Sequence, residues 1–186
     1  MRTTQAMRRF GSGLLKEAAL TAPADAARII GSLCAAFGRQ SGRPVDHMFT
    51  RFPPGTASGL WIDLPDRDLV VVEERARPEL QLVIACHELW HAKEGTCDEH
   101  SSGLSVAARL AGGDSSVAEL LASEAGLSEV VHRAAARAHA VASAEVEAET
   151  FGLYLGEKLK PYLPGSQAAA VPEEIRRVHK TLGWGG

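Results

Sequence analysis

Two histidines and a glutamate stand close together in His87-Glu88-Leu89-Trp90-His91, an H-E-x-x-H pattern. On a helix, which turns by about 100° per residue, His87 and His91 lie one above the other on one face. Their ring nitrogens can then reach one metal ion, and Glu88 can touch a water at that ion without binding the ion itself. Two imidazoles, a carboxylate base and an open coordination position are the requirements of zinc-dependent hydrolysis.

The residues around this pattern predict a buried helix. Pro78 suits the first turn, where its missing N–H costs nothing. Lys93 and Gly95 suit the last turn and a left-handed cap. The segment between them is apolar nearly all round, through Leu80, Leu82, Val83, Ile84, Leu89 and Trp90. Histidine and glutamate side chains are costly on such a helix unless something uses them, which favours a metal site over a chance match.

A third metal ligand is expected from a later helix. Residues 128–159 are typical of one long helix that carries Glu145, Glu147 and Glu149. Glu145 and Glu149 share a face, and Glu147 points about 160° away from both. Glu147 falls on a stripe that we interpret as core-facing, made of Ala136, Ala140, Ser143, Ala144, Phe151 and Tyr154. We therefore predict that Glu147 is the third ligand and that its two neighbours are solvated; the alternative for Glu147 is a buried ion pair with an arginine or a histidine.

The rest of the chain predicts an α+β protein that is mostly helical. Residues 59–64 and 68–73 are rich in branched and aromatic side chains and predict a β-hairpin, with a third strand over 47–52. This small three-stranded sheet should pack beside the H-E-x-x-H helix, and residues 23–40 predict another amphipathic helix. We expect a loose tail over residues 1–20 and one domain over 21–186. Within that domain, residues 96–126 predict a lid or a surface insertion, and 172–182 a last short helix.

Composition limits the class of protein. The chain has 186 residues, of which 45% are hydrophobic, enough for one domain with a sizeable core. A net charge of −3 with no basic run argues against direct binding of nucleic acid, and no stretch is long and apolar enough to span a membrane. Lys16 and Glu17 interrupt the apolar run of a would-be signal peptide, and three cysteines make no disulfide framework. We therefore expect a cytoplasmic protein.

Several motifs together resemble the ImmA/IrrE family of metallopeptidases, over roughly residues 45 to 160. They are Gly59-Leu-Trp-Ile-Asp, Val70-Val-Val, His87-Glu-Leu-Trp-His and Glu145-Val-Glu-Ala-Glu-Thr-Phe-Gly. The resemblance implies a zincin-like fold, Zn2+ held by His87, His91 and Glu147, and Glu88 as the catalytic glutamate. It also implies proteolysis of a regulatory protein partner, such as a repressor or an antitoxin. The chain departs from the family pattern at Trp90 (usually glycine), Glu149 (usually asparagine or aspartate) and Gly152 (usually alanine).

We thus expect a zinc-dependent endopeptidase in which Glu88 accepts a proton from water and passes it to the leaving amine. Tyr154, two turns beyond Glu147 on the same face, is a candidate oxyanion donor, as are His100 and His139. Two other interpretations stay open. One is a non-catalytic zincin-fold component of a toxin or regulator pair that acts by binding, and the other is a zinc hydrolase of a non-peptide substrate.

Overall fold

The computed structural model describes residues 3–52, 54, 57–64, 66–95 and 142–165, with the side chains of 142–144 excepted. The described residues form four α-helices, three strands and one short 3-10 helix. In chain order they are α1 (Gln5–Ala18), α2 (Ala26–Ser41), β1 (Val45–Thr50), β2 (Gly59–Asp63), β3 (Asp68–Glu73), α3 (Pro78–Glu94), α7 (Ala142–Leu159) and η2 (Lys160–Tyr162). The predicted insertion over 96–126, the first part of the long helix, the helix over 172–182, His100 and His139 lie outside the described residues.

The three strands form one mixed sheet in the order β1-β3-β2. β2 and β3 are the predicted hairpin and pair antiparallel, with Trp61 opposite Val70. β1 pairs with β3 in parallel, with His47 opposite Val70, and begins two residues before the predicted strand. The α+β class and the three-stranded sheet are therefore confirmed.

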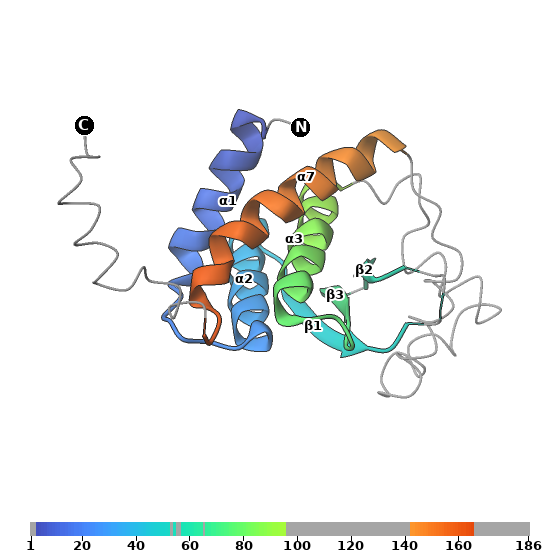
Figure 1. Cartoon of the computed structure of the whole chain (residues 1–186). Helices are drawn as coiled ribbons and strands as arrows, with labels where there is room; N and C mark the ends of the chain where they lie inside the picture. Colours follow the sequence, from blue (N-terminus) through green and yellow to red (C-terminus); the bar gives the residue numbers. More distant parts are fainter. Residues whose placement is uncertain (1–2, 53, 55–56, 65, 96–141, 166–186) are drawn as a thin grey trace, which may run out of the picture.

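One face of this sheet carries the helices and the main core. Val70 and Val72 of β3 are fully buried among side chains of α2 and α3, such as Leu33 and Ile84. Figure 1 shows β1 running below α2 and α3, so the H-E-x-x-H helix lies directly on the sheet. α3 has the predicted bounds, with Pro78 in its first turn and Gly95 as its cap at φ 63°. A helix buried this way fixes its side chains rigidly, which a metal site needs.

α7 lies against α3 over most of its length because two glycines face that helix. A Cβ at Gly152 would lie 2.8 Å from the backbone oxygen of Val83, and one at Gly156 would lie 2.6 Å from Val83 Cγ2. Only glycine allows the two helices to approach this closely. The approach brings the first turns of α7 beside the last turns of α3, where the two histidines are.

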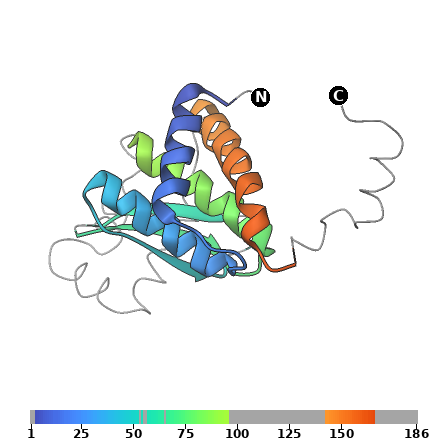
Figure 2. The same ribbon diagram turned by 90° about the vertical axis from the view of Figure 1, so that its left-hand side faces the viewer.

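The N-terminal segment differs from the prediction. We expected a loose tail over residues 1–20, but residues 5–18 form α1, whose start is capped by the side chain of Thr4. Met7, Gly11 and Leu14 are buried, and Phe10 stacks on Phe151 of α7 at a centroid distance of 5.3 Å. Figure 2 shows α1 lying alongside α7. The physical reason is an apolar repeat at helical spacing, which makes this segment amphipathic and gives it a face to bury.

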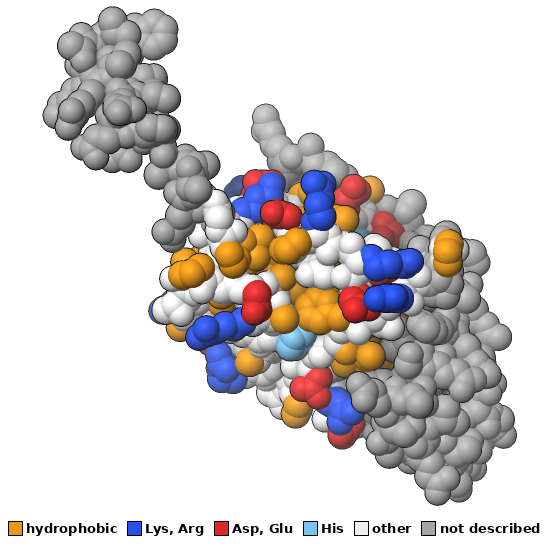
Figure 3. Space-filling view, turned by 60° about the horizontal axis from the view of Figure 1, so that its bottom comes forward, with side chains coloured by type: hydrophobic (Ala, Val, Ile, Leu, Met, Phe, Trp, Pro, Cys, Tyr) orange, Lys and Arg blue, Asp and Glu red, His pale blue; other side chains and the backbone are white. Residues whose placement is uncertain are grey.

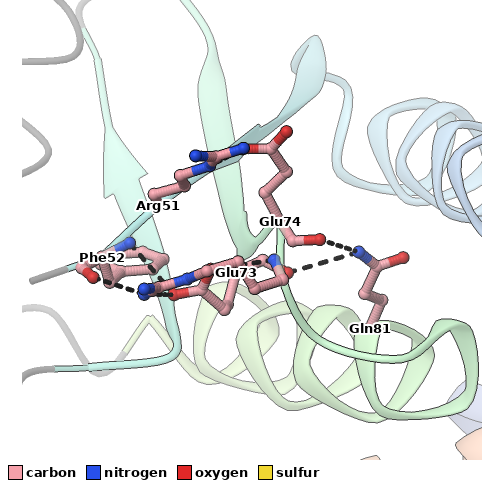
Figure 4. A network of polar contacts seen from close by, with 6 residues as sticks. Arg51, Phe52, Glu73, Glu74 and Gln81 are labelled. Carbon is pink, nitrogen blue, oxygen red and sulfur yellow. Dashed lines mark hydrogen bonds and ion pairs between the residues drawn. The ribbon is translucent and has the colours of Figure 1, made fainter. Parts of the chain in front are cut away.

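A polar network lies at the end of β3 that leads to α3 (Figure 4). The Glu73 carboxylate accepts hydrogen bonds from the backbone N–H of Phe52 and from the guanidinium of Arg75. The Arg75 guanidinium, more than any other group, lowers the pKa of Glu73 to about 2. Gln81 of α3 donates to the backbone oxygens of Glu73 and Glu74, at 3.3 and 3.1 Å. The network ties the loop before β2 and the first turn of α3 to the same end of β3.

The surface in Figure 3 mixes Lys and Arg with Asp and Glu around apolar side chains. The described side chains on that face therefore form no field of a single sign, such as a phosphate backbone would require. Within the described part of the chain, no helix has the length and apolar character needed to cross a bilayer.

Candidate metal centre

His87 and His91 lie one turn apart on α3 with their Nε2 atoms 3.0 Å from each other. Glu145, in the first turn of α7, faces both rings. Its Oε2 lies 3.4 Å from His87 Nε2, and its Oε1 lies 3.2 Å from His91 Nε2. The three side chains are half-buried, so the group is open to solvent on one side. Together they could hold a metal ion.

The spacing of these donors fits one metal ion. With bonds of about 2.0 to 2.1 Å, neighbouring ligands of a tetrahedral ion are about 3.3 Å apart. The two Nε2 atoms are 3.0 Å apart, and each lies 3.2 to 3.4 Å from a different oxygen of the Glu145 carboxylate, so all three separations are close to that value. One ligand atom from each of His87, His91 and Glu145 lies within 4.8 Å of the other two, and no fourth His, Cys, Asp or Glu of the described residues joins them.

The third member of the group corrects the sequence prediction, which named Glu147. Glu147 is exposed and lies on the opposite side of α7 from Glu145. The face of α7 that meets α3 instead carries Glu145, Gly152 and Gly156. The stripe predicted to face the core contains Phe151 and Tyr154, which pack toward α1. α7 is thus buried on two sides, and the prediction of Glu147 refers to the side that does not face the two histidines.

A signal for the correct side was present in the sequence. Gly152 and Gly156 are four residues apart and share a helix face with Ala148. A run of small residues at that spacing marks where another backbone approaches closely. Counting back from Gly152 by seven residues reaches Glu145, which makes it the glutamate on the approached face.

Glu88 lies beside the metal group but outside it. Its side chain is buried under β2, where the backbone N–H of Trp61 donates to the carboxylate. A Cβ at Gly59 would lie 2.6 Å from Glu88 Oε1 and 2.5 Å from Ile84 Cγ2, so glycine makes room for the carboxyl group. Burial, and then the charge of Glu145, raise the pKa of Glu88 to about 8. Sequence reasoning did not find these two roles of β2.

The two histidines sit in a mixed electrostatic environment. Burial is the main cause that lowers the pKa of His87, and the neighbouring His91 lowers it further. The carboxylates of Glu145 and Glu149 act in the opposite direction. The balance lowers the pKa of His87 and favours its neutral imidazole, the form that binds a metal ion.

Tyr154 does not reach this group. Its ring packs toward α1, with Cε1 3.2 Å from where a Cβ of Gly11 would be, and Lys158 Nζ lies 5.3 Å from the ring centroid. On α7 it is about half a helical turn away from Glu145. The structure thus gives the predicted oxyanion role of Tyr154 no geometric support.

Trp90, which stands where the resembled family has glycine, belongs to an aromatic cluster. Its ring centroid lies 4.9 Å from that of Phe151 and 6.1 Å from that of Phe10. Lys93 Nζ lies 4.5 Å from the Trp90 ring, a cation–π contact. The large side chain is accommodated because it points toward α1, away from the metal group.

Comparisons with known proteins identify no relative. No family model, no curated protein and no solved structure matches this chain. The resemblance to the ImmA/IrrE metallopeptidases therefore depends on the motifs alone and stays a prediction.

Proposed function

We propose that this protein is a zinc-dependent endopeptidase, with His87, His91 and Glu145 as metal ligands and Glu88 as the general base. One observation carries the proposal. One nitrogen of each histidine and one oxygen of Glu145 lie within 4.8 Å of one another, close enough to share one metal ion, while a separate carboxylate is held beside them. Structural metal sites are closed by four protein ligands, whereas catalytic sites keep one position open. A three-donor group with an adjacent base supports the catalytic kind.

The donor set favours zinc. Two imidazole nitrogens and one carboxylate oxygen are typical ligands of this ion, and its preferred geometry is tetrahedral. When bound, zinc supplies a Lewis acid and lowers the pKa of a coordinated water to about 7. The group contains no thiolate, the soft ligand that Cu(I) and iron–sulfur sites prefer.

Glu88 is suited to move the proton. Its carboxyl group is one residue beyond His87 on α3 and is oriented by the Trp61 N–H, so it cannot turn into the ligand set without losing that bond. A carboxylate in this place accepts the proton of the attacking water and delivers it to the leaving amine. The hydrogen bond from β2 thus separates the role of Glu88 from that of Glu145.

The edge of β2 supports a peptide as the substrate. Glu73 N donates to Ser58 O and Leu64 N donates to Arg67 O, so the even-numbered residues of β2 bond to β3. The backbone groups of Gly59, Trp61 and Asp63 then point away from β3; the Trp61 N–H donates to Glu88, and the groups of Gly59 and Asp63 and the carbonyl of Trp61 remain for a partner. Within the described residues, β3 is the only strand that pairs with β2, so the opposite edge of β2 has no strand beside it. An extended peptide can add to such an edge as a further strand, next to Glu88.

The resemblance to the ImmA/IrrE family supports a particular class of substrate. It favours a regulatory protein, such as a repressor or an antitoxin, over general protein degradation. A short segment of that partner would need to be extended in order to pair with β2.

The test combines metal content with hydrolysis. Elemental analysis of protein purified without chelators should show one zinc per chain, and Glu88→Gln should keep that zinc. Zinc-loaded protein is then incubated with a library of unfolded proteins, and new termini are identified by mass spectrometry. We expect cleavage by the parent and none by Glu88→Gln.

Two results would count against the proposal. A zinc content of zero that persists after zinc is added would remove the metal site. The non-catalytic interpretation would be favoured if zinc-loaded parent protein produced no new termini. This applies to the library and to a regulatory protein encoded by a neighbouring gene.

A further inference from the structure

We propose that Glu149 is a positioning residue for His87, whose Nδ1–H it accepts in a hydrogen bond so that Nε2 stays directed at the metal. The inference rests on the proposed function in one respect only, that His87 binds a metal ion through Nε2. It assigns a role to a side chain that the metal group itself does not include.

The position of Glu149 follows from how α7 crosses α3. The two helices run in opposite directions, because Glu145 faces His91 and His87 whereas Gly156 faces Val83. Gly152, between them, lies against His87, with a Cβ there 3.2 Å from His87 Cβ. Glu149 is four residues after Glu145 and three before Gly152, so both of its neighbours along the helix contact His87. Along the contact between α3 and α7, Glu149 therefore lies level with His87.

The chemistry of the imidazole ring calls for an acceptor at this place. His87 Nε2 faces His91 and Glu145. A neutral imidazole that gives its Nε2 lone pair to a metal carries its proton on Nδ1, at the other side of the ring. Metal-binding histidines usually donate this proton to a carboxylate or a carbonyl, which fixes the tautomer and the ring orientation.

The charge of Glu149 already acts on His87. Both Glu145 and Glu149 favour the protonated form of this ring, against the effect of burial. Glu149 is exposed, so its side chain can rotate toward the ring without displacing core residues. Glu145 is occupied by the two Nε2 atoms, which leaves Glu149 as the carboxylate on this face for the second nitrogen.

The chain offers a matched control in Glu147. It has the same charge, is also exposed and is two residues away on the same helix, but it lies on the far side. Removing Glu147 changes the net charge as much as removing Glu149 does. A difference between the two variants therefore reports nearness to the site and not the change in net charge, and the comparison with Glu149→Gln separates a hydrogen bond from a charge effect.

The experiment measures zinc affinity by competition with a chromophoric chelator for the parent, Glu149→Ala, Glu149→Gln and Glu147→Ala. We expect Glu149→Ala to weaken zinc binding by about 10- to 100-fold, the usual loss for a carboxylate behind a histidine ligand. Glu149→Gln should lose less, because its amide oxygen still accepts a hydrogen bond. Glu147→Ala should bind as the parent does.

A second measurement reads the ring directly. In 15N NMR of the zinc-loaded parent, the His87 Nδ1–H should be protected from exchange with water. We expect this protection to be lost in Glu149→Ala and kept in Glu147→Ala, which a purely structural role of Glu149 would not produce.

Three outcomes would overturn the inference. Equal affinities of Glu149→Ala and Glu147→Ala would show that Glu149 has no part in the site. Equal losses in Glu149→Ala and Glu149→Gln that vanish in high salt would show a charge effect without a hydrogen bond. A parent chain that binds no zinc would overturn both proposals, whereas zinc-binding parent protein with an unaffected Glu149→Ala would overturn this one alone.

Discussion

At the scale of single residues, the metal group depends on which glutamate of α7 faces the two histidines. Glu145 and Glu147 are separated by one residue and are both acidic, yet only Glu145 lies within 3.4 Å of a histidine nitrogen. Positions i and i+2 on a helix point about 200° apart, so a side chain of the right type can point in the wrong direction. The identity of the ligand is therefore a question of helix register.

We predict that Glu145→Ala weakens zinc binding more than the roughly 10- to 100-fold typical of an indirect contact, because it removes one of three donors. Glu147→Ala should leave zinc binding unchanged. Titration of both variants with zinc, beside the parent, checks the expectation. If Glu147→Ala were the sensitive variant, α7 would have to be rotated by about half a turn relative to the structure described.

At the scale of elements, the site exists because α7 approaches α3 closely. The contact at Gly152 is against a backbone oxygen, which cannot rotate away as a side chain can. The same approach sets the distance from Glu145 to the rings, since Glu145 lies two turns along α7 from Gly152. Close packing and metal binding should therefore respond together to a change at this position.

We predict that Gly152→Ala lowers the free energy of unfolding by about 1 to 3 kcal/mol, because its Cβ would force the helices apart. Zinc affinity should fall in the same variant. Gly13→Ala in α1 is the control, because its Cβ would meet only the side chain of Gln40 at 3.5 Å. An alanine there should be neutral or stabilise the protein by up to about 1 kcal/mol, as expected in a helix.

Urea unfolding of both variants gives the free energy of unfolding, and its change on adding zinc reports the zinc affinity. Gly152→Ala as stable as Gly13→Ala would mean that α3 and α7 can separate at little cost. The close approach would then not be what holds Glu145 in place.

At the scale of the whole molecule, α1 packs on the side of α3 that faces away from the metal group. Phe10 contacts Trp90 of α3, Phe151 of α7 and Phe37 of α2, and so joins three helices in one aromatic cluster. Aromatic pairs at these distances add stability beyond the area that they bury. The N-terminal segment is thus part of the support that keeps α3 and α7 together.

We predict that Phe10→Ala destabilises the protein by about 3 kcal/mol, at the lower end for a phenylalanine because the ring is only partly buried. Arg9→Ala, an exposed neighbour on the same helix, should change stability by less than about 0.5 kcal/mol. Thermal unfolding of the two variants measures this. Equal stabilities would mean that residues 5–18 do not hold the core, as our sequence prediction of a tail had assumed.

The sequence by itself determined the features that depend on neighbours along the chain. His87 and His91 share a face through a four-residue spacing, and Pro78 and Gly95 set the limits of their helix. The hairpin of β2 and β3 also has a local pattern, because its branched residues flank a short turn. The α+β class follows from these elements.

Tertiary structure decided the features that depend on which surfaces meet. α7 has two apolar stripes, and sequence periodicity cannot say which of them packs on α3 and which on α1. The environment of Glu88 is built by Gly59 and Trp61, which are more than 25 residues earlier in the chain. Direction on a helix is set by the partner that covers it, so only the packed molecule placed Glu145, and not Glu147, beside the histidines.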